Sequence, residues 1–595
     1  MKNVVNRAIW AKKNEISYSE SGLTVKRSFR VLAAGLLALA VSAFALSSCS
    51  DKIYEEINTD PTKAYNVNPS SQLSYAELEI YGDMNYVDVH RLYVYAFTQH
   101  LMGCWNTTNY GGQHRSDDIE MGRPWNNLYP AAIRNLTDAI ESTKDNATLA
   151  NTNAALRIFR VYVGGLLTDY YGDVPFKEAG LGFISGNTQP KYDTQEDLYH
   201  FFFTELKAAA AQFNSSAELI SSDPLFNGNI ESWKTFANSL RLRYAMRLSK
   251  VDEALAKQEF AAALNDGVMK SASDNACVQH MNVSYSFGQE SYSDFRGNAL
   301  AKYFFGNDPA NNPTYICQTF WKQLYDNADP RTLRLCRFYI DDFMSLSTGE
   351  GRIDMTDSLM ATVQANPGTK LIYEIAPGEF SWNNWPSYVD LPGSALANKI
   401  AEIQKMHTDY NPDKNSRWMM PKLANNFLRS DNPGVLMTYA EVCFLRAEAV
   451  ELGWGTGDDA KTLYETGIRE AMNFLADYYG CAAVTDGEYA TYLAQPNIAY
   501  GADDKIKQIN TQAWILHFHN PAEAWANVRR SNFPKLTPPV GGGDHPIIDG
   551  AEIPVRLCYP LKEETYSKAA YEEAKKRVET AGFTYDWHAP LWWDK

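Results

Sequence analysis

Helical periodicity dominates the chain beyond its first 70 residues. From Trp233 to Leu248, apolar residues recur at intervals of three and four, which predicts an amphipathic helix. The charged residues between them, Lys234, Arg241, Arg243 and Arg247, are expected to form its solvent face. A second helix is predicted to begin at Thr194-Gln195-Glu196-Asp197, which resembles a capping box, and to continue through Ala209.

A helix, turn, helix unit is predicted near residues 435–479. Residues 435–452 are apolar nearly all round and end at Gly453, and residues 458–479 repeat apolar positions before Gly480. The span is close to the 34-residue tetratricopeptide repeat, although alanine-rich antiparallel helices pack in this way in other folds too. Gly453-Trp454-Gly455-Thr456-Gly457 follows a helix and not a strand, so it indicates a turn and not a phosphate loop.

Two stretches interrupt the helical pattern. In residues 272–313 and 348–394, Gly, Pro, Asn and Ser punctuate aromatic residues, and no long helical stripe remains. Long irregular segments of this kind are typical of functional loops. We therefore predict a mostly α fold of tetratricopeptide-like helical hairpins, whose long irregular loops form a ligand-binding face.

The N-terminus indicates export and lipidation. Three basic residues precede a 16-residue apolar run, Val31 to Leu46, which is too short to span a bilayer and is typical of a signal peptide. Leu46-Ser47-Ser48-Cys49 then resembles a lipobox. We predict a lipoprotein signal peptide at 1–48, an acylated Cys49, a lipid-anchored tether over 49–70 and one helical domain over 71–595. The alternative is an ordinary secreted protein that is cleaved nearby.

Composition and charge narrow the range of partners. Acidic residues outnumber basic ones by 71 to 55, and removal of residues 1–48 would leave 69 against 48, a net charge of −21. No basic stripe is present to neutralise phosphates, so nucleic acid is not expected as a partner. Anionic lipid headgroups would repel such a chain, and contact with a membrane is expected through the lipid anchor only.

No catalytic or metal-binding motif is found. The chain has no HExxH, GxSxG, Walker A or EF-hand pattern, and its seven cysteines after Cys49 show no CxxC spacing. His517 and His519 flank an aromatic residue and are expected to pack in the core, as is Cys443. We expect no enzyme activity, no cofactor and no metal. A carboxylate pair of a surface glycosidase cannot be identified from spacing in the sequence, so that alternative stays open.

Several fragments, in this order, resemble the SusD/RagB-like nutrient-binding outer-membrane lipoproteins, and the SusD-like branch in particular. They are Ile57-Asn58-Thr59-Asp60-Pro61-Thr62, Thr168-Asp169-Tyr170-Tyr171-Gly172-Asp173-Val174-Pro175-Phe176, Pro190-Lys191-Tyr192-Asp193, Trp233 to Arg243, Asp329-Pro330-Arg331, Thr438-Tyr439-Ala440-Glu441, Ala524-Trp525, Arg529 to Pro534 and Ile553 to Pro560.

This resemblance implies a helical lipoprotein on the outer-membrane surface of a Gram-negative bacterium. It would capture an oligosaccharide and deliver it to a SusC-like TonB-dependent transporter, on which it sits as a lid. A surface glycoside hydrolase and a tetratricopeptide scaffold without a ligand are the alternatives. The charged motif residues Arg241, Arg243, Asp329 and Arg331 are expected to be structural and not ligand contacts.

Two loops carry the side chains that a sugar ring requires. Pyranose rings present apolar C–H faces edged by hydroxyls, so their sites combine exposed aromatic faces with amides. The family's site likewise uses an aromatic arc with an Asn that comes partly from an N-terminal loop. Packing of these aromatic residues onto the body is the alternative, and it is the role expected of Trp125, Trp321 and Trp525. The predicted ligand-binding residues are Trp105, Asn106 and Tyr110 in the first loop, and Trp382, Asn383, Trp385 and Tyr388 in the second.

Overall fold

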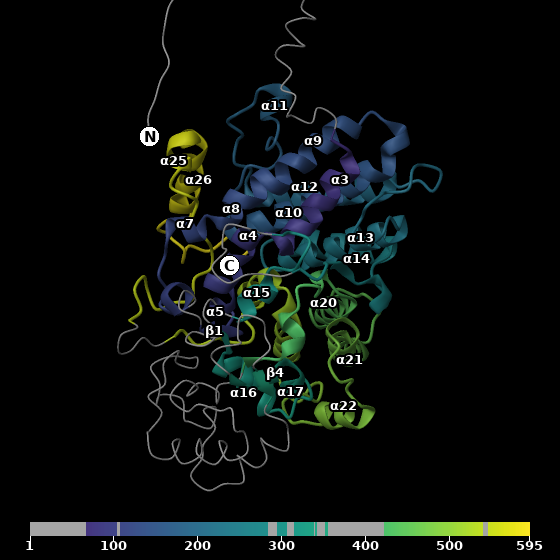
Figure 1. The fold of residues 1–595 in the computed structure, drawn as a ribbon, viewed down its shortest axis with the longest axis vertical. Helices are drawn as coiled ribbons and strands as arrows, with labels where there is room; N and C mark the ends of the chain where they lie inside the picture. Colours follow the sequence, from purple (N-terminus) through teal and green to yellow (C-terminus); the bar gives the residue numbers. More distant parts are fainter. Residues whose placement is uncertain are drawn as a thin grey trace, which may run out of the picture. The chain divides into compact units, whose positions relative to one another are not determined.

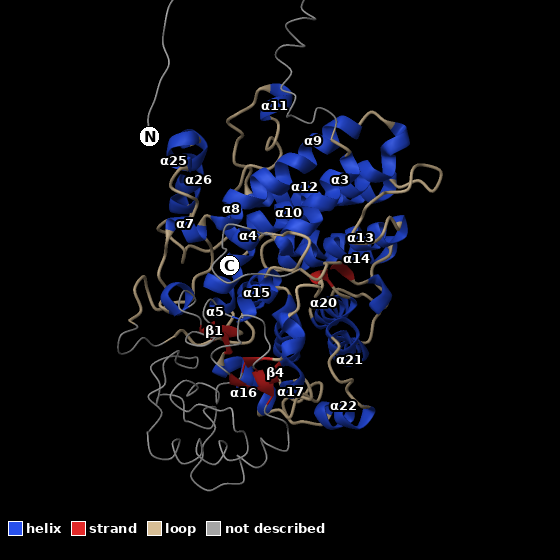
Figure 2. Ribbon diagram, in the orientation of Figure 1, coloured by secondary structure: helices blue, strands red, loops and turns tan. Residues whose placement is uncertain are grey.

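Helices make up most of the described chain (Figures 1 and 2). The structure is a computed structural model, and it describes residues 67–103, 108–283, 294–305, 314–337, 339–341, 352–354, 422–539 and 546–594. Residues Asn68–Lys595 belong to one compact unit. The predicted mostly α fold is confirmed. The predicted signal peptide and Cys49 lie outside the described residues, and no described helix is both long and apolar enough to cross a membrane.

The helices up to residue 274 surround a large apolar core. They are α3 (Pro69–Gly82), α4 (Met84–Val89), η1 (His90–Val94), α5 (Tyr95–Phe97), η2 (Thr108–Gly112), α7 (Asp118–Met121), α8 (Arg123–Leu128), η3 (Tyr129–Ile133), α9 (Arg134–Thr143), η4 (Ala147–Leu149), α10 (Ala150–Tyr171), α11 (Gly182–Ser185), α12 (Gln195–Gln212), α13 (Ile230–Arg247), α14 (Glu253–Asp266) and η5 (Ala272–Asp274).

The remaining helices are α15 (Leu300–Phe305), α16 (Gln318–Tyr325), α17 (Thr332–Leu335), η7 (Asn425–Leu428), α20 (Tyr439–Glu451), α21 (Ala460–Tyr479), α22 (Asp486–Leu493), α23 (Lys505–Leu516), η8 (His517–His519), α24 (Pro521–Ser531), α25 (Glu563–Tyr566) and α26 (Lys568–Thr580). A second apolar cluster joins α20, α21, α22 and α23.

The described strands are short and form four antiparallel pairs. β1 (Leu101–Gly103) pairs with β3 (Thr314–Ile316), β2 (Ala276–Val278) with β8 (Gly434–Met437), β4 (Cys336–Arg337) with β7 (Lys422–Leu423), and β5 (Tyr339–Asp341) with β6 (Arg352–Asp354). The stretch 272–313, expected to be irregular, therefore also contains β2 and α15. Of the stretch 348–394, only β6 is described.

Local sequence accounts for the start of α12 and for the α20–α21 hairpin. Thr194 caps α12, since its hydroxyl accepts from the backbone N–H of Asp197 at 3.1 Å. Gly453 has φ +73° in the turn between α20 and α21, as a left-handed turn residue requires. The predicted helix over 435–452 begins late, because residues 434–437 pair with β2 as strand β8. An apolar run of this length fits a buried strand as well as a buried helix.

The expectation that the arginines of α13 face solvent is wrong. Arg241, Arg243 and Arg247 are 0%, 4% and 1% exposed, because α12, α14 and α20 cover the helix on several sides. Each guanidinium forms an ion pair with a carboxylate from another helix. Only Lys234 keeps a partly exposed side chain, beside Glu231. The expected structural role of Arg241 and Arg243 is therefore confirmed, although their predicted location is not.

A buried carboxyl lies on the inner side of α3. Glu77 is fully buried, and neither of its carboxyl oxygens has a hydrogen-bond partner within the described chain. The neighbouring Asp223 accepts from three backbone N–H groups and from the Trp233 indole. Burial, and then the negative charge of Asp223, raise the pKa of Glu77 well above its ordinary value. The folded protein therefore keeps a proton on Glu77 to a higher pH than the unfolded chain does.

Glu77→Gln is expected to raise the melting temperature at pH 7 to 8 and to leave it nearly unchanged near pH 4. A carboxyl whose pKa is higher in the folded state than in the unfolded state stabilises the fold fully at pH values below its unfolded pKa. As the pH rises from the unfolded pKa towards the folded pKa, the free energy of unfolding falls by about 1.4 kcal/mol per pH unit. The glutamine cannot ionise, so it escapes this loss. Thermal melts from pH 4 to 8 measure the effect, with Glu564→Gln on the exposed surface as control. A lower melting temperature for Glu77→Gln at pH 8 would contradict this interpretation.

Candidate ligand-binding site

The first predicted loop is attached to the C-terminal part of the chain. His114 accepts through its backbone carbonyl from the Asp549 N–H at 2.9 Å, and its Nδ1 lies 3.0 Å from the Gly550 carbonyl oxygen. The N–H and hydroxyl of Ser116 both donate to the Asp549 carboxylate, at 2.8 and 2.6 Å. These contacts bring two segments together that are more than 430 residues apart in the sequence. They fix the position of the residues that follow Tyr110.

Tyr110, in η2, is the predicted site residue that the structure describes in full. It is half-buried, with its ring centroid 5.9 Å from that of Tyr93 and with the Arg115 guanidinium 5.6 Å above the ring. Burial, followed by the charges of Glu120 and Asp117, raises the pKa of its hydroxyl. Part of the Tyr110 ring therefore packs against neighbouring side chains, and its hydroxyl stays protonated at neutral pH, so it can donate a hydrogen bond.

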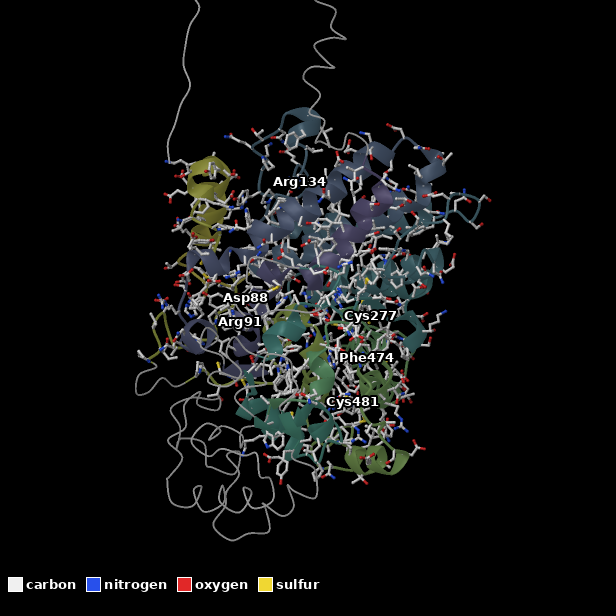
Figure 3. All side chains as sticks on the ribbon, in the orientation of Figure 1. Asp88, Arg91, Arg134, Cys277, Phe474 and Cys481 are labelled. Atoms are coloured by element: carbon white, nitrogen blue, oxygen red, sulfur yellow. The ribbon has the colours of Figure 1, made fainter. Side chains whose placement is uncertain are left out.

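Gly111 allows the loop to lie close to the helical body. A Cβ at this position would lie 2.5 Å from the Leu92 carbonyl oxygen of η1 and 2.8 Å from the Ala96 Cβ of α5. The helices below are themselves fixed by polar contacts. Asp88 and Arg91, labelled in Figure 3, form a buried ion pair at 2.6 Å where α4 continues into η1. The glycine-rich composition of the loop thus has a packing reason in addition to any role in binding.

The described residues before the first predicted loop belong to a group of short strands. Gly103, at the end of β1, pairs with Thr314 of β3, and β3 contacts β7, which begins at Lys422. In the sequence, Trp105 and Asn106 follow β1 after Cys104, and the second loop lies between β6 and β7. Trp105, Asn106, Trp382, Asn383, Trp385 and Tyr388 lie outside the described residues. Their role in binding stays a prediction.

The tryptophans expected to pack in the body do so. Trp125, Trp321 and Trp525 are 5%, 1% and 1% exposed. Asp329 and Arg331 are also buried and form an ion pair at 2.6 Å, as their predicted structural role requires. Cys443 is buried, and so is Cys277, labelled in Figure 3; both are free thiols.

A group of buried polar side chains beside His517 resembles a metal site in its spacing. Glu441, His517 and Glu523 offer ligand atoms within 4.8 Å of one another. The carboxylates are already engaged, since Arg243 lies 2.7 Å from Glu441 and Arg247 lies 2.6 Å from Glu523. Burial alone would raise the pKa of Glu523, but the positive charges of Arg247 and Arg243 outweigh this effect and lower the pKa to about 2. Two guanidinium groups thus supply the positive charge that a cation would bring, and the group is an ion-pair network.

His517 and His519 are both buried, as predicted, and His519 packs against aromatic rings. His519 stacks on Tyr479 with ring centroids 4.8 Å apart and on Phe427 at 5.8 Å. Burial lowers the pKa of His517, and it lowers that of His519 to about 3. Buried imidazoles with lowered pKa values are core side chains, which explains why an isolated His-x-His spacing is a poor indicator of a metal site.

These features define a class of protein: a helical protein of packed hairpins with a few short strand pairs. Comparison with known families makes the assignment specific. Residues 61–351 and 386–560 match the SusD-like family described as "Starch-binding associating with outer membrane". The chain belongs to this family. The match includes Trp105, Asn106, Tyr110 and Tyr388, whereas Trp382, Asn383 and Trp385 lie in the unmatched interval.

Solved structures agree with this assignment. A SusD-like protein, "Bacteroidetes AC2a SusD-like", is 71% identical over 89% of this chain and 100% of its own, with a TM-score of 0.80. A chitin-binding protein is 29% identical over 89% of this chain and 100% of its own, with a TM-score of 0.69. A SusD homologue from Bacteroides uniformis, 20% identical over 89% and 99%, shares the fold with a TM-score of 0.63. No curated protein matches the chain.

Proposed function

We propose that this protein binds an oligosaccharide at the cell surface, without cleaving it, and delivers it to a SusC-like TonB-dependent outer-membrane transporter. The observation that carries the proposal is the match to the starch-binding, outer-membrane-associated family over two segments that together cover most of the chain. The similar chitin-binding protein supports a carbohydrate ligand. The aromatic and amide residues of the two loops supply the chemistry that a sugar ring requires.

A glycan panel separates this function from its alternatives. The purified protein is incubated with starch, chitin oligosaccharides and other polysaccharides, and both retention and released sugars are measured. Retention without released sugar supports capture. Released sugar would support a surface glycosidase instead. If the protein neither retains a glycan nor releases sugar from it, a scaffold without a ligand is favoured. Crosslinking and co-purification in mild detergent test for the transporter, and elution of the native protein alone would contradict the proposed handover.

Cys49→Ala is expected to release the protein from the membrane. The lipobox-like Leu46-Ser47-Ser48 leads to Cys49, and acyl chains on that thiol would anchor the protein because each buried methylene contributes about 0.8 kcal/mol. Fractionation of cells into membrane and soluble proteins measures the change. Ser50→Ala, one residue away and without a thiol, is the control and should remain with the membrane. An alanine variant at Cys49 that still fractionates with outer membranes in a strain without the transporter would show that the anchor is elsewhere.

A further inference from the structure

A cleft of about 230 Å³ lies between the end of α10, the start of α12, the end of α26 and the C-terminal tail. It shares no residue with the loop that carries Tyr110. Pockets for drug-sized ligands occupy about 300 to 1,000 Å³, so this cleft suits a smaller molecule such as a single sugar ring. Its lining includes Gly172, Gln195, Arg556, Tyr559, Phe583 and Trp592.

Arg556 is a buried cation in the wall of this cleft. Its side chain is 2% exposed, and its guanidinium lies 5.5 and 5.0 Å from the ring centroids of Tyr559 and Tyr585. It donates a hydrogen bond to the Tyr171 carbonyl oxygen, and the Tyr559 side chain is a further hydrogen-bond partner. Among the described residues, no carboxylate lies within 4.0 Å of it, and its Nε has no hydrogen-bond partner. A buried charge without a counterion is costly, so an anionic group in the cleft would be stabilised.

Gln195 supplies an acceptor in the same cleft. It is 1% exposed, and its Nε2 donates to the Thr168 carbonyl oxygen at 2.8 Å. That bond fixes the orientation of the amide, so Oε1 is the atom that faces away from Thr168. This Oε1 is buried and has no partner in the part of the chain that the structure describes. Gln195 and Arg556 thus each bring an unpaired polar atom to residues that line the same cleft, an acceptor and a donor, which fits a ligand that carries both a hydroxyl and an anionic group.

The other charges of the cleft do not supply the missing anion. Asp173 is paired with Arg577 at 2.5 Å, and it also accepts from the Gln195 N–H at 2.8 Å. Glu196 lies on the exposed rim. The cleft also faces the first turn of α12, whose dipole favours negative charge. Arg556 is therefore the lining cation that is left without a carboxylate partner among the described residues, while Phe583, Leu591 and Trp592 contribute apolar surface to the cleft.

We propose that this cleft is a second ligand site, which binds one acidic sugar residue of the hexuronate class. The carboxylate accepts hydrogen bonds from the Arg556 guanidinium, and a ring hydroxyl donates to Gln195 Oε1. The C–H face of the sugar ring packs on the apolar wall at Phe583 and Trp592. This inference stands independently of the proposed transport function, because it rests on residues that the two aromatic loops do not contribute.

Isothermal titration of the full-length protein with D-glucuronate, D-galacturonate and D-glucose tests the proposal. At least one uronate is expected to bind with one site per chain and at least tenfold more tightly than glucose. Gln195→Glu places a negative charge where the ligand lies and should weaken uronate binding at least tenfold. Gln189→Glu, the same change on the exposed surface, is the matched control and should bind uronate as the unchanged protein does.

Two further variants test the proposal, one in the cleft and one in the aromatic loops. Ala581→Trp narrows the mouth of the cleft from an exposed position and should also weaken uronate binding if Gln195→Glu does not fold. A variant with Trp105, Trp382 and Trp385 changed to alanine should retain uronate binding even where polysaccharide binding is lost. Equal affinity for glucose and uronate, no binding of either uronate, or uronate binding unchanged in the cleft variants would each overturn the proposal.

Discussion

Arg243→Met is expected to lower the free energy of unfolding by about 3 to 5 kcal/mol, the cost of breaking a buried ion pair by removal of one partner. Arg243 is 4% exposed on α13, and its Nε and Nη2 donate to the two carboxylate oxygens of Glu441 at 2.7 and 2.8 Å. It also donates to the Leu436 carbonyl oxygen at 2.7 Å, and Glu523 lies 3.5 Å away. Methionine fills similar space but leaves the buried Glu441 without a counterion.

The neighbouring Arg247 extends the same network. It lies 2.6 Å from Glu523 of α24 and 3.2 Å from Asp169 of α10. Four helices, α10, α13, α20 and α24, are thus joined by charges that have little access to water. The loss of one guanidinium is expected to destabilise the contacts between these helices and not only one side chain.

Chemical denaturation of Arg243→Met against the unchanged protein measures the effect. Lys234→Met, on the same helix but partly exposed, is the matched control and should change the free energy of unfolding by less than about 0.5 kcal/mol. A double variant, Arg243→Met with Glu441→Gln, should recover part of the loss because it removes both charges. A loss below about 1 kcal/mol for Arg243→Met would mean that the pair contributes little to stability.

Alanine at Trp105, Trp382 and Trp385 together is expected to abolish glycan binding at little cost to the melting temperature. Stacking of a ring on an aromatic side chain is worth about 1 to 3 kcal/mol by analogy with stacked bases, so the loss of three such contacts would lower affinity at least a hundredfold. Exposed aromatic residues contribute little to folding, which is why the melting temperature should hold. The ligand for this experiment is the glycan that the panel identifies.

Binding and melting must be measured on the same preparations. Tyr566→Ala removes an aromatic ring that is 69% exposed on α25, away from both loops in the sequence, and serves as the control. If the triple variant binds normally, the loops are not the site. If it unfolds instead, the tryptophans pack against the body as Trp125 does. Either result would leave the family assignment intact.

Much of the fold could be predicted from local patterns. The start of α12 at Thr194, the α20–α21 hairpin and the burial of Trp525 all follow from short-range features: a capping residue, turn glycines and apolar periodicity. The strand at residues 434–437 could not be separated from the helix that follows it. A continuous apolar run has no period that distinguishes the two structures, and the pairing partner, β2, lies more than 150 residues earlier.

The candidate site could be predicted only partly from the sequence. The residue types that a sugar ring requires could be recognised in the two loops from the sequence. The half-buried state of Tyr110 could not, because it depends on contacts with Arg115 and Tyr93 that no spacing rule would select. The cleft at Arg556 was missed altogether. Arg556 lies in a fragment shared with the family, but its lack of a counterion is visible only where α10, α12 and the C-terminal tail meet.

The sequence by itself determined the helical character of this protein, its family and the residues offered for sugar binding, because capping, periodicity and ordered motifs are properties of neighbouring residues. Tertiary structure alone decided which charges are buried. Arg241, Arg243 and Arg247 have the spacing of a solvent face, yet they are buried and pair with carboxylates from other helices. Desolvation and ion pairing depend on what surrounds a side chain in space, and a pattern along one helix contains no record of the helices packed against it.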